Sequence, residues 1–223
     1  MLDSLNAMLD ALPYLLGGVG VTVAAVLGGM ALGLIIGVPL AVAQVYGHPL
    51  LGRLAGVYVW YFRGTPILVL LFMFYFGLFP LMGLDVNALS ATAIVLGLAS
   101  GAYQSQIFRG SILSLAHGQF RAASAVGMSD SQTIRHIILP QALRLSLPGW
   151  SNEYSILLKD SALGYVLGAL DIMARTHFVA SRTYEHLALY ALAALLYFVL
   201  TWAGIRSLRA LEQKVAIRGY GMT

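Results

Sequence analysis

Long runs without a formal charge are the feature that most limits what this chain can fold into. Four such runs cover residues 11–52, 64–84, 86–108 and 186–205. A helix needs about 20 mostly apolar residues to cross a bilayer. Hydrophobic residues make up 59% of the chain and charged residues 10%, whereas a typical soluble domain has about 25% charged residues. The sequence therefore predicts an all-α integral membrane protein and argues against a soluble domain.

A fifth apolar stretch, residues 142–170, carries four charged side chains within it, Arg144, Glu153, Lys159 and Asp160. We expect five transmembrane helices in a single domain over residues 1–223, with approximate spans 12–44, 56–83, 86–108, 141–168 and 186–206. The first run is long enough for two short spans. We interpret it as one helix because its clear turn signal, Tyr-Gly-His-Pro at residues 46–49, comes late.

The distribution of Lys and Arg predicts the orientation in the membrane. With five spans, one side receives most basic residues: Arg53, Arg63, Arg109, Arg121, Arg135, Arg144, Arg206, Arg209, Lys214 and Arg218. The other side receives only Arg175 and Arg182. Because basic residues favour the cytoplasmic side, we expect the N-terminus outside and the C-terminus in the cytoplasm. The chain begins with Met-Leu-Asp-Ser, which lacks the basic start of a secretory signal, so we expect the first helix to be retained.

Three glycines, Gly29, Gly33 and Gly37, lie four residues apart in the first predicted helix and share one ridge. Small residues let helix backbones approach closely in lipid, where hydrophobic burial does not drive helices together. The ridge suits packing against another helix of this chain or against a second subunit, and the sequence leaves both open.

The segment over residues 109–140 joins the third and fourth predicted spans and is too polar to cross the membrane. Its alanine-rich part, residues 120–126, predicts a short helix. Gly127 is suited to end that helix in the left-handed conformation.

A second short helix is predicted over residues 133–139. Ser129 and Gln132 have the spacing of a capping box that would start it, and Pro140 should disturb it. A rigid hairpin of two small helices suits docking into a cleft on another protein. The alternative is an interfacial helix that only connects two spans.

The spacing in this segment resembles the coupling-loop signature of bacterial ABC importer permeases. Ala122-Ala123 is followed by Gly127 and then by Ile-Ile-Leu-Pro at residues 137–140. Phe-Arg-Gly-Thr-Pro at residues 62–66 and Lys-Asp-Ser-Ala-Leu at residues 159–163 look like two further hallmarks of the polar amino-acid branch. Three motifs in this order cover nearly the whole chain. Arg121 departs from the pattern, since the family usually has Glu there.

The resemblance implies a multi-pass permease of the bacterial inner membrane that works with partners. They are a second permease, identical or homologous, two cytoplasmic ABC ATPase subunits and an external amino-acid-binding protein. It assigns ATPase coupling to Arg121, Ala122, Ala123, Gly127, Leu139 and Pro140. ATP and Mg would be handled by the ATPases, so we expect no bound cofactor and no catalysis by this chain. Lys159 and Lys214 are its only lysines, and neither lies in a phosphate-binding Gly-x4-Gly-Lys loop.

The charges in the fourth predicted span are candidates for substrate contact, because a charge at the bilayer centre costs about 2.5–3.5 kcal/mol on insertion scales. Glu153 and Asp160 share one helix face, and Asn152 and Lys159 share another. We expect six residues in the substrate path: Asn152, Glu153, Lys159, Asp160, Ser161 and Gln104. An acid in the path favours a cationic amino acid. The alternatives are internal ion pairing for the charges and hydrogen bonding between helices for Gln104.

Two other classes of protein compete with the importer. A stand-alone secondary transporter would use Glu153 and Asp160 as a proton relay, but the sequence has no clear inverted repeat. A membrane-embedded enzyme is disfavoured, because the five histidines are spread over both sides and form no metal motif. The scattered basic residues also argue against a nucleic-acid partner.

Overall fold

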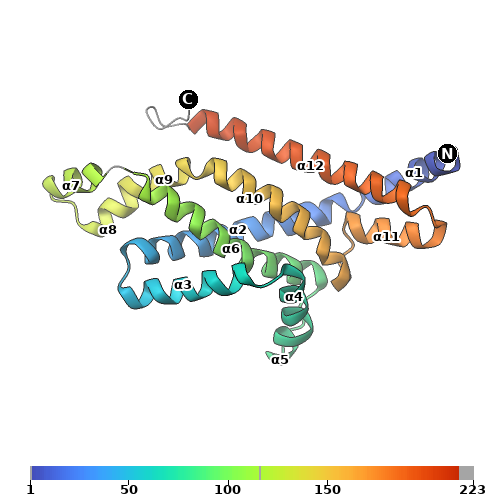
Figure 1. The fold of residues 1–223 in the computed structure, drawn as a ribbon, viewed down its shortest axis with the longest axis horizontal. Coiled ribbons are helices and arrows are strands. Elements are labelled where there is room, and N and C mark those ends of the chain that lie inside the picture. The colour runs from blue at the N-terminus through green and yellow to red at the C-terminus, as the bar shows by residue number, and fades with distance from the viewer. Residues whose placement is uncertain (1, 116, 216–223) are drawn as a thin grey trace.

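The computed structural model describes residues 2–115 and 117–215, and within them it contains helices and no strands (Figure 1). Arg218, which supports the predicted orientation, lies outside the described residues. The elements in chain order are α1 (Leu2–Leu16), α2 (Val19–Tyr46), α3 (Pro49–Gly64), α4 (Ile67–Phe72), the π-helical η1 (Met73–Leu78), α5 (Phe79–Leu81), α6 (Ala88–Leu113), α7 (His117–Ala125), α8 (Asp130–Thr133), the π-helical η2 (Ile134–Ile138), α9 (Leu139–Leu145), α10 (Leu147–Asp160), the 3₁₀-helical η3 (Ser161–Leu167), α11 (Ile172–Thr183) and α12 (His186–Val215).

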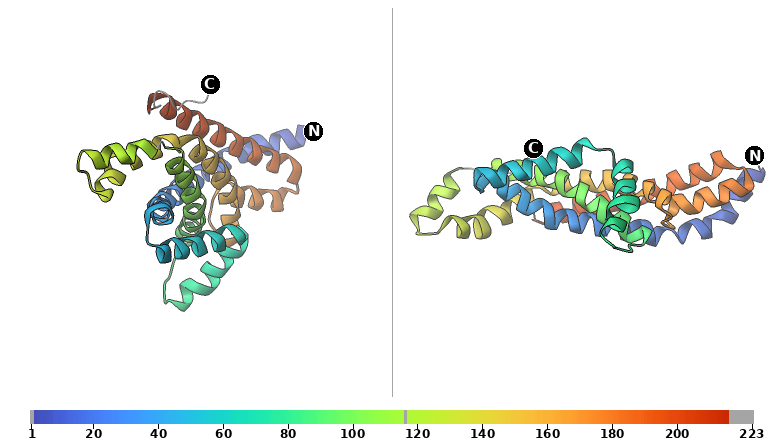
Figure 2. Two further views of the ribbon diagram at one scale, coloured as in Figure 1. Left: turned by 60° about the vertical axis from the view of Figure 1, so that its left-hand side comes forward. Right: turned by 90° about the horizontal axis from the view of Figure 1, so that it is seen from below.

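The long helices α2, α6, α10 and α12 run roughly along the longest axis of the molecule (Figures 1 and 2). The short helices α7 and α8 project at one end, and the C-terminal turns of α12 point toward that end. Helices α1 and α11 lie at the opposite end. The molecule therefore has two distinct ends, each carrying short helices.

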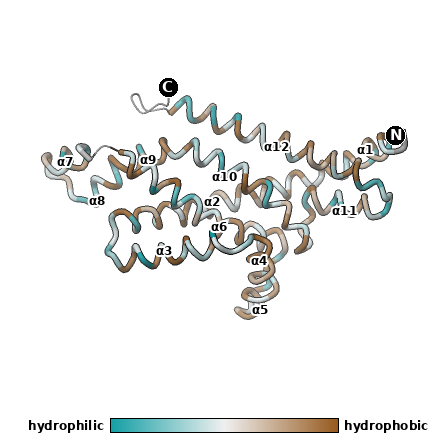
Figure 3. Tube along the Cα trace, viewed as in Figure 1, coloured by the Kyte–Doolittle hydropathy of each residue, from teal (hydrophilic) through white to brown (hydrophobic). Residues whose placement is uncertain are grey.

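Apolar residues of α2, α6 and α10 form a shared core. Val26 and Met30 of α2 pack with Leu96 of α6 and with Leu157 and Leu158 of α10, and all five side chains are buried. Figure 3 shows apolar residues along much of α12 and polar residues in its C-terminal turns. By length and composition α2 and α12 can each cross a membrane, and the bent pair α3 and Ile67–Leu81 would add a third span if counted as one.

The glycine ridge of α2 packs against α6 of the same chain. A Cβ atom at Gly37 would lie 3.0 Å from the Cβ of Gln104 and 3.1 Å from the backbone nitrogen of Ser105. Gly29 and Gly33 also face α6 side chains at close range. Of the two uses left open by the sequence, the structure shows packing within the chain.

The helix expected over residues 12–44 is divided in the structure. Helix α1 ends at Leu16 and α2 begins at Val19, so Gly17 and Gly18 form a break. A Cβ atom at Gly18 would lie 2.6 Å from the carbonyl carbon of Asp171. The break brings the chain against the start of α11, a contact that local sequence cannot reveal.

The prediction of one continuous helix over residues 56–83 is also wrong. Helix α3 begins earlier, at Pro49, and the following helical stretch, Ile67–Leu81, leaves it at 105°. Thr65 is extended, with φ −104° and ψ 130°, because Pro66 disfavours the helical conformation of the residue before it. The Thr65 hydroxyl donates to the carbonyl oxygen of Tyr61 at 2.8 Å. The bend turns α4 away from the bundle (Figure 1).

The remaining helices depart less from expectation. Helix α6 begins at Ala88, two residues later than the stretch expected over 86–108, and continues to Leu113, while α12 covers 186–206 and continues to Val215. The stretch 141–168 is divided among α9, α10 and η3. Helix α11 was not expected, because its residues are polar and fall between two apolar runs.

We predict that Gly18→Ala lowers the stability of the protein, because the added methyl group meets backbone atoms that cannot rotate away. The expected loss is about 1–3 kcal/mol, typical of overpacking, and is seen as a lower Tm of the purified protein. Gly20→Ala is the matched control, since no atom lies within 4 Å of its added Cβ. Equal Tm values for the two variants would contradict this account of the break.

Candidate functional site

Glu153, which was expected in the substrate path, is buried inside the chain. Its side chain is 3% exposed. The Ser100 hydroxyl of α6 donates to its Oε1 at 2.6 Å. This carboxylate is therefore held at the α6–α10 contact rather than at the surface of the chain.

Gln104 extends this contact into a network that we call the polar core, comprising Ser100, Gln104, Trp150 and Glu153. The Trp150 Nε1 donates to Gln104 Oε1 at 2.7 Å. The Gln104 Nε2 donates to the backbone oxygen of Met30 at 3.1 Å and to the Ser100 hydroxyl at 3.0 Å. The polar core thus joins α2, α6 and α10. These bonds are the helix-to-helix contacts that we considered as the alternative for Gln104.

A second set of polar residues lies on another face of α10. Asn152 and Lys159 are exposed, and Ser155 is half-buried between them. These three residues, the polar stripe, share one helix face because they are spaced by three and four positions. Asp160 is half-buried beside the stripe.

The polar stripe leads into a groove between α10 and α12. This cavity of about 240 Å³ is lined by Ser151, Asn152 and Ser155 and by Arg209 and Glu212 of α12. The Ser151 hydroxyl is buried and has no hydrogen-bond partner within the described residues. A polar groove of this kind suits water or a polar solute rather than lipid chains.

The two hallmark motifs outside the coupling segment meet in space. Ile67, just after the bend in the first motif, packs against the buried cluster that contains Leu157 and Leu158, just before the second motif. The Arg63 guanidinium lies 5.2 Å from the ring centroid of Tyr103 on α6. Ser161 is buried, and its hydroxyl donates to the backbone oxygen of Leu158 at 2.7 Å. The bend, α6 and the end of α10 therefore converge on one region.

At the far end of the molecule, residues 117–138 form a compact unit that we call the hairpin. Gly127 turns the chain with φ +80°, as predicted, and the Met128 N–H donates to the Ala123 oxygen at 3.1 Å. The expected capping box is present between Ser129 and Gln132. The first helix begins at His117, earlier than expected.

The six residues expected to contact the ATPases have different surroundings. Arg121, Ala122, Gly127 and Pro140 are exposed, whereas Ala123 is 2% exposed and packs inside the hairpin. Leu139 is partly buried and packs against a buried cluster that includes Ala41 of α2 and Phe108 of α6.

The disturbance expected at Pro140 is the π-helical stretch η2, in which the Leu139 N–H donates to the Ile134 oxygen. A wider helical turn of this kind accommodates proline, which has no N–H to donate. The hairpin is therefore joined to α2 and α6 through packed apolar side chains.

Comparison with known proteins identifies the family. Residues 29–217 match the family described as binding-protein-dependent transport system inner membrane component. The chain belongs to this family.

Three similar proteins carry names from amino-acid transport. A probable amino-acid ABC transporter permease, PatM of Vibrio harveyi, is 37% identical over 86% of this chain and 87% of its own length. The arginine transport system permease ArtQ of Bacillus subtilis is 32% identical over 94% of this chain and 96% of its own length. The histidine/lysine/arginine/ornithine permease HisM of Salmonella typhimurium is 32% identical over 90% of this chain and 89% of its own length.

A solved structure agrees with these relatives. The crystal structure of an amino acid ABC transporter with histidines matches with a TM-score of 0.82 and 29% identity, covering 93% of this chain and 96% of that chain. The chain is thus the inner-membrane permease component of an ABC importer, a non-catalytic subunit whose partner ATPase hydrolyses ATP. This assignment disfavours the stand-alone transporter and the membrane enzyme.

Proposed function

We propose that this permease moves polar amino acids, including cationic ones, into the cytoplasm of a bacterial cell. The observation that carries the proposal is the polar stripe on α10, whose Asn152 and Lys159 are exposed within a predicted membrane span. A polar or charged group within the bilayer normally faces a partner or a water-filled cavity. The permeases named for arginine and for histidine, lysine, arginine and ornithine support the substrate class.

Six residues form the proposed path, with two different roles. Asn152, Lys159 and Asp160 line it, because their side chains are exposed or half-buried. Glu153, Ser161 and Gln104 form the wall behind it, because they are buried and hydrogen-bonded within the chain.

The chemistry of the lining matches a zwitterionic solute. An amino acid needs an acceptor for its ammonium group and a donor for its carboxylate. Asp160 offers the acceptor, while Lys159 and the Asn152 amide offer donors. Asp160 and the nearby Glu153 together favour a positively charged side chain.

The exposed position of the stripe implies that the path lies between this chain and a second permease, identical or homologous. Five spans would then comprise α2, α3–α5, α6, α9–η3 and α12.

Two ABC ATPase subunits would bind the hairpins, and an external amino-acid-binding protein would deliver the substrate. The hairpin and most basic residues fall on the cytoplasmic side in this arrangement, and the N-terminus lies outside.

The hairpin is the proposed contact with the ATPase. Ala122 and Val126 are exposed at its end, and Val126 is 77% exposed. Small and apolar residues on a rigid projection fit a cleft on a partner, and Arg121 requires an acid or a neutral surface opposite it. Leu139 carries the motion of the docked hairpin to α2 and α6.

We predict that Asp160→Asn lowers arginine uptake about ten-fold, equivalent to about 1.4 kcal/mol, and changes glutamine uptake less than two-fold. The neutral amide keeps the shape but no longer attracts a cationic side chain. Uptake is measured in proteoliposomes that contain the permease with its ATPase and binding protein, with ATP inside. Glu185→Gln, which neutralises an acid outside the predicted spans, is the control.

Equal losses for arginine and glutamine would assign Asp160 to structure alone. Uptake by the permease without an ATPase, driven by a proton gradient, would contradict the proposed function itself.

We also predict that Ala122→Trp uncouples ATP hydrolysis from transport, since a bulky side chain at an exposed hairpin position blocks docking without disturbing the fold. Transport per ATP hydrolysed should fall about ten-fold or more, with Tm unchanged. Ala123→Trp is the comparison, because this buried position should lower Tm as well. Normal coupling in Ala122→Trp would refute the docking surface.

A further inference from the structure

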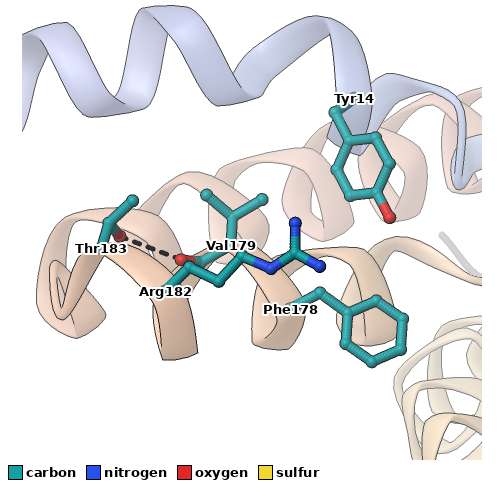
Figure 4. Close-up of a pocket in the computed structure, with 5 residues that line it drawn as sticks. All are labelled: Tyr14, Phe178, Val179, Arg182 and Thr183. Atoms are coloured by element: carbon teal, nitrogen blue, oxygen red, sulfur yellow. Dashed lines mark hydrogen bonds between the residues drawn. The ribbon is translucent and has the colours of Figure 1, made fainter.

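A groove separates α1 from α11 at the end of the molecule opposite the hairpin (Figure 4). A cavity of about 500 Å³ is lined there by Tyr14, Phe178, Val179, Arg182 and Thr183. An adjoining cavity of about 420 Å³ shares three of these residues and reaches Asp10. We call the two cavities together the α1–α11 groove. The proposed transport path does not use it.

One face of α11 combines positive charge with an aromatic ring. Arg175, Phe178 and Arg182 are spaced by three and four positions and so share this face. Phe178 is 46% exposed, and Tyr14 across the groove is 44% exposed, while Ala180 on the opposite face of α11 is fully buried. Arginine beside exposed aromatic residues is typical of a helix that lies in the membrane interface.

The two arginines of this face have different roles. The Arg175 guanidinium lies 4.9 Å from the Tyr14 ring centroid and donates to the Tyr14 backbone oxygen at 3.1 Å. It therefore fixes α1 against α11. The Arg182 guanidinium extends toward Phe178 and Tyr14 (Figure 4). The hydrogen bond drawn in this view does not involve Arg182, because it joins the Thr183 hydroxyl to the backbone oxygen of Val179. The charge of Arg182 thus points at the groove.

Helix α12 places the groove at the depth of lipid headgroups. Trp202, with Arg206 stacked over its ring at 4.9 Å, is typical of one membrane boundary, and His186, stacked on Tyr190, lies at the other end of the helix. His186 and Arg206 are separated by about 30 Å at 1.5 Å per residue, which is the thickness of the hydrocarbon layer. Leu189, one turn after His186, packs with residues of α1 and α11.

We propose that the α1–α11 groove binds an anionic phospholipid of the outer leaflet. The Arg182 guanidinium pairs with the phosphate, a geometry that arginine favours, and Phe178 and Tyr14 contact the glycerol and upper acyl chain. Asp10 lies in the adjoining cavity and repels a second anion, so one headgroup is held at the Arg182 end. The inference relies on the bilayer placement proposed above but not on the substrate.

Native mass spectrometry of the purified permease–ATPase complex, titrated with phosphatidylglycerol or phosphatidylcholine, tests the proposal. Arg182→Gln should weaken phosphatidylglycerol binding about ten-fold, as expected for loss of a charge-assisted pair. Phosphatidylcholine binding should change less. Arg209→Gln on α12, at the hairpin end, is the matched control and should leave both affinities within two-fold. Thr183→Trp, which fills the groove without removing charge, should reproduce the loss.

Three results would overturn the proposal. One is unchanged phosphatidylglycerol binding in both groove variants. Another is displacement of the lipid by millimolar inorganic phosphate, which would make the groove a site for free anions. The third is a loss of binding-protein affinity in lipid-free detergent on Arg182→Gln, which would assign the face to that partner. Because transport is not the readout, failure here leaves the proposed function standing.

Discussion

The structure depends on how α10 distributes its polar side chains. A bilayer offers no water to satisfy them, so each must be paired inside the protein or face a polar neighbour. Glu153 is paired inside the protein, because its carboxylate accepts a hydrogen bond from the Ser100 hydroxyl. Asn152 and Lys159, on the other face, remain exposed. The same helix therefore stabilises the bundle on one side and requires a polar surrounding on the other.

The exposed surfaces of this chain indicate where its partners bind. The polar stripe needs a polar path, and the exposed end of the hairpin needs a cleft. Large apolar side chains are also exposed, among them Trp60 at 76% and Leu81 at 83%, as expected for a surface covered by lipid or a second permease. Gly33 and its neighbours on the ridge are already used inside the chain, so they are not available to a second subunit.

Patterns that depend on neighbouring residues could be predicted from sequence. The left-handed Gly127 and the capping box at Ser129 were confirmed, since both follow from local backbone chemistry. The helical class followed equally from the apolar runs. The break at Gly18 and the buried state of Glu153 could not be predicted, because each depends on a contact with residues far along the chain. Pro66 is itself a local signal for the bend, but the apolar run around it favoured the prediction of a continuous helix.

The most direct test of the central claim uses the absence of cysteine from the sequence. Single cysteines at Asn152, at buried Leu158 and at exposed apolar Val199 of α12 are treated, in the assembled importer in membranes, with a charged thiol reagent. The account predicts rapid labelling at Asn152 that substrate slows, and little labelling at the other two positions. An unreactive cysteine at Asn152, or equal labelling at Asn152 and Val199, would contradict a water-filled path along α10.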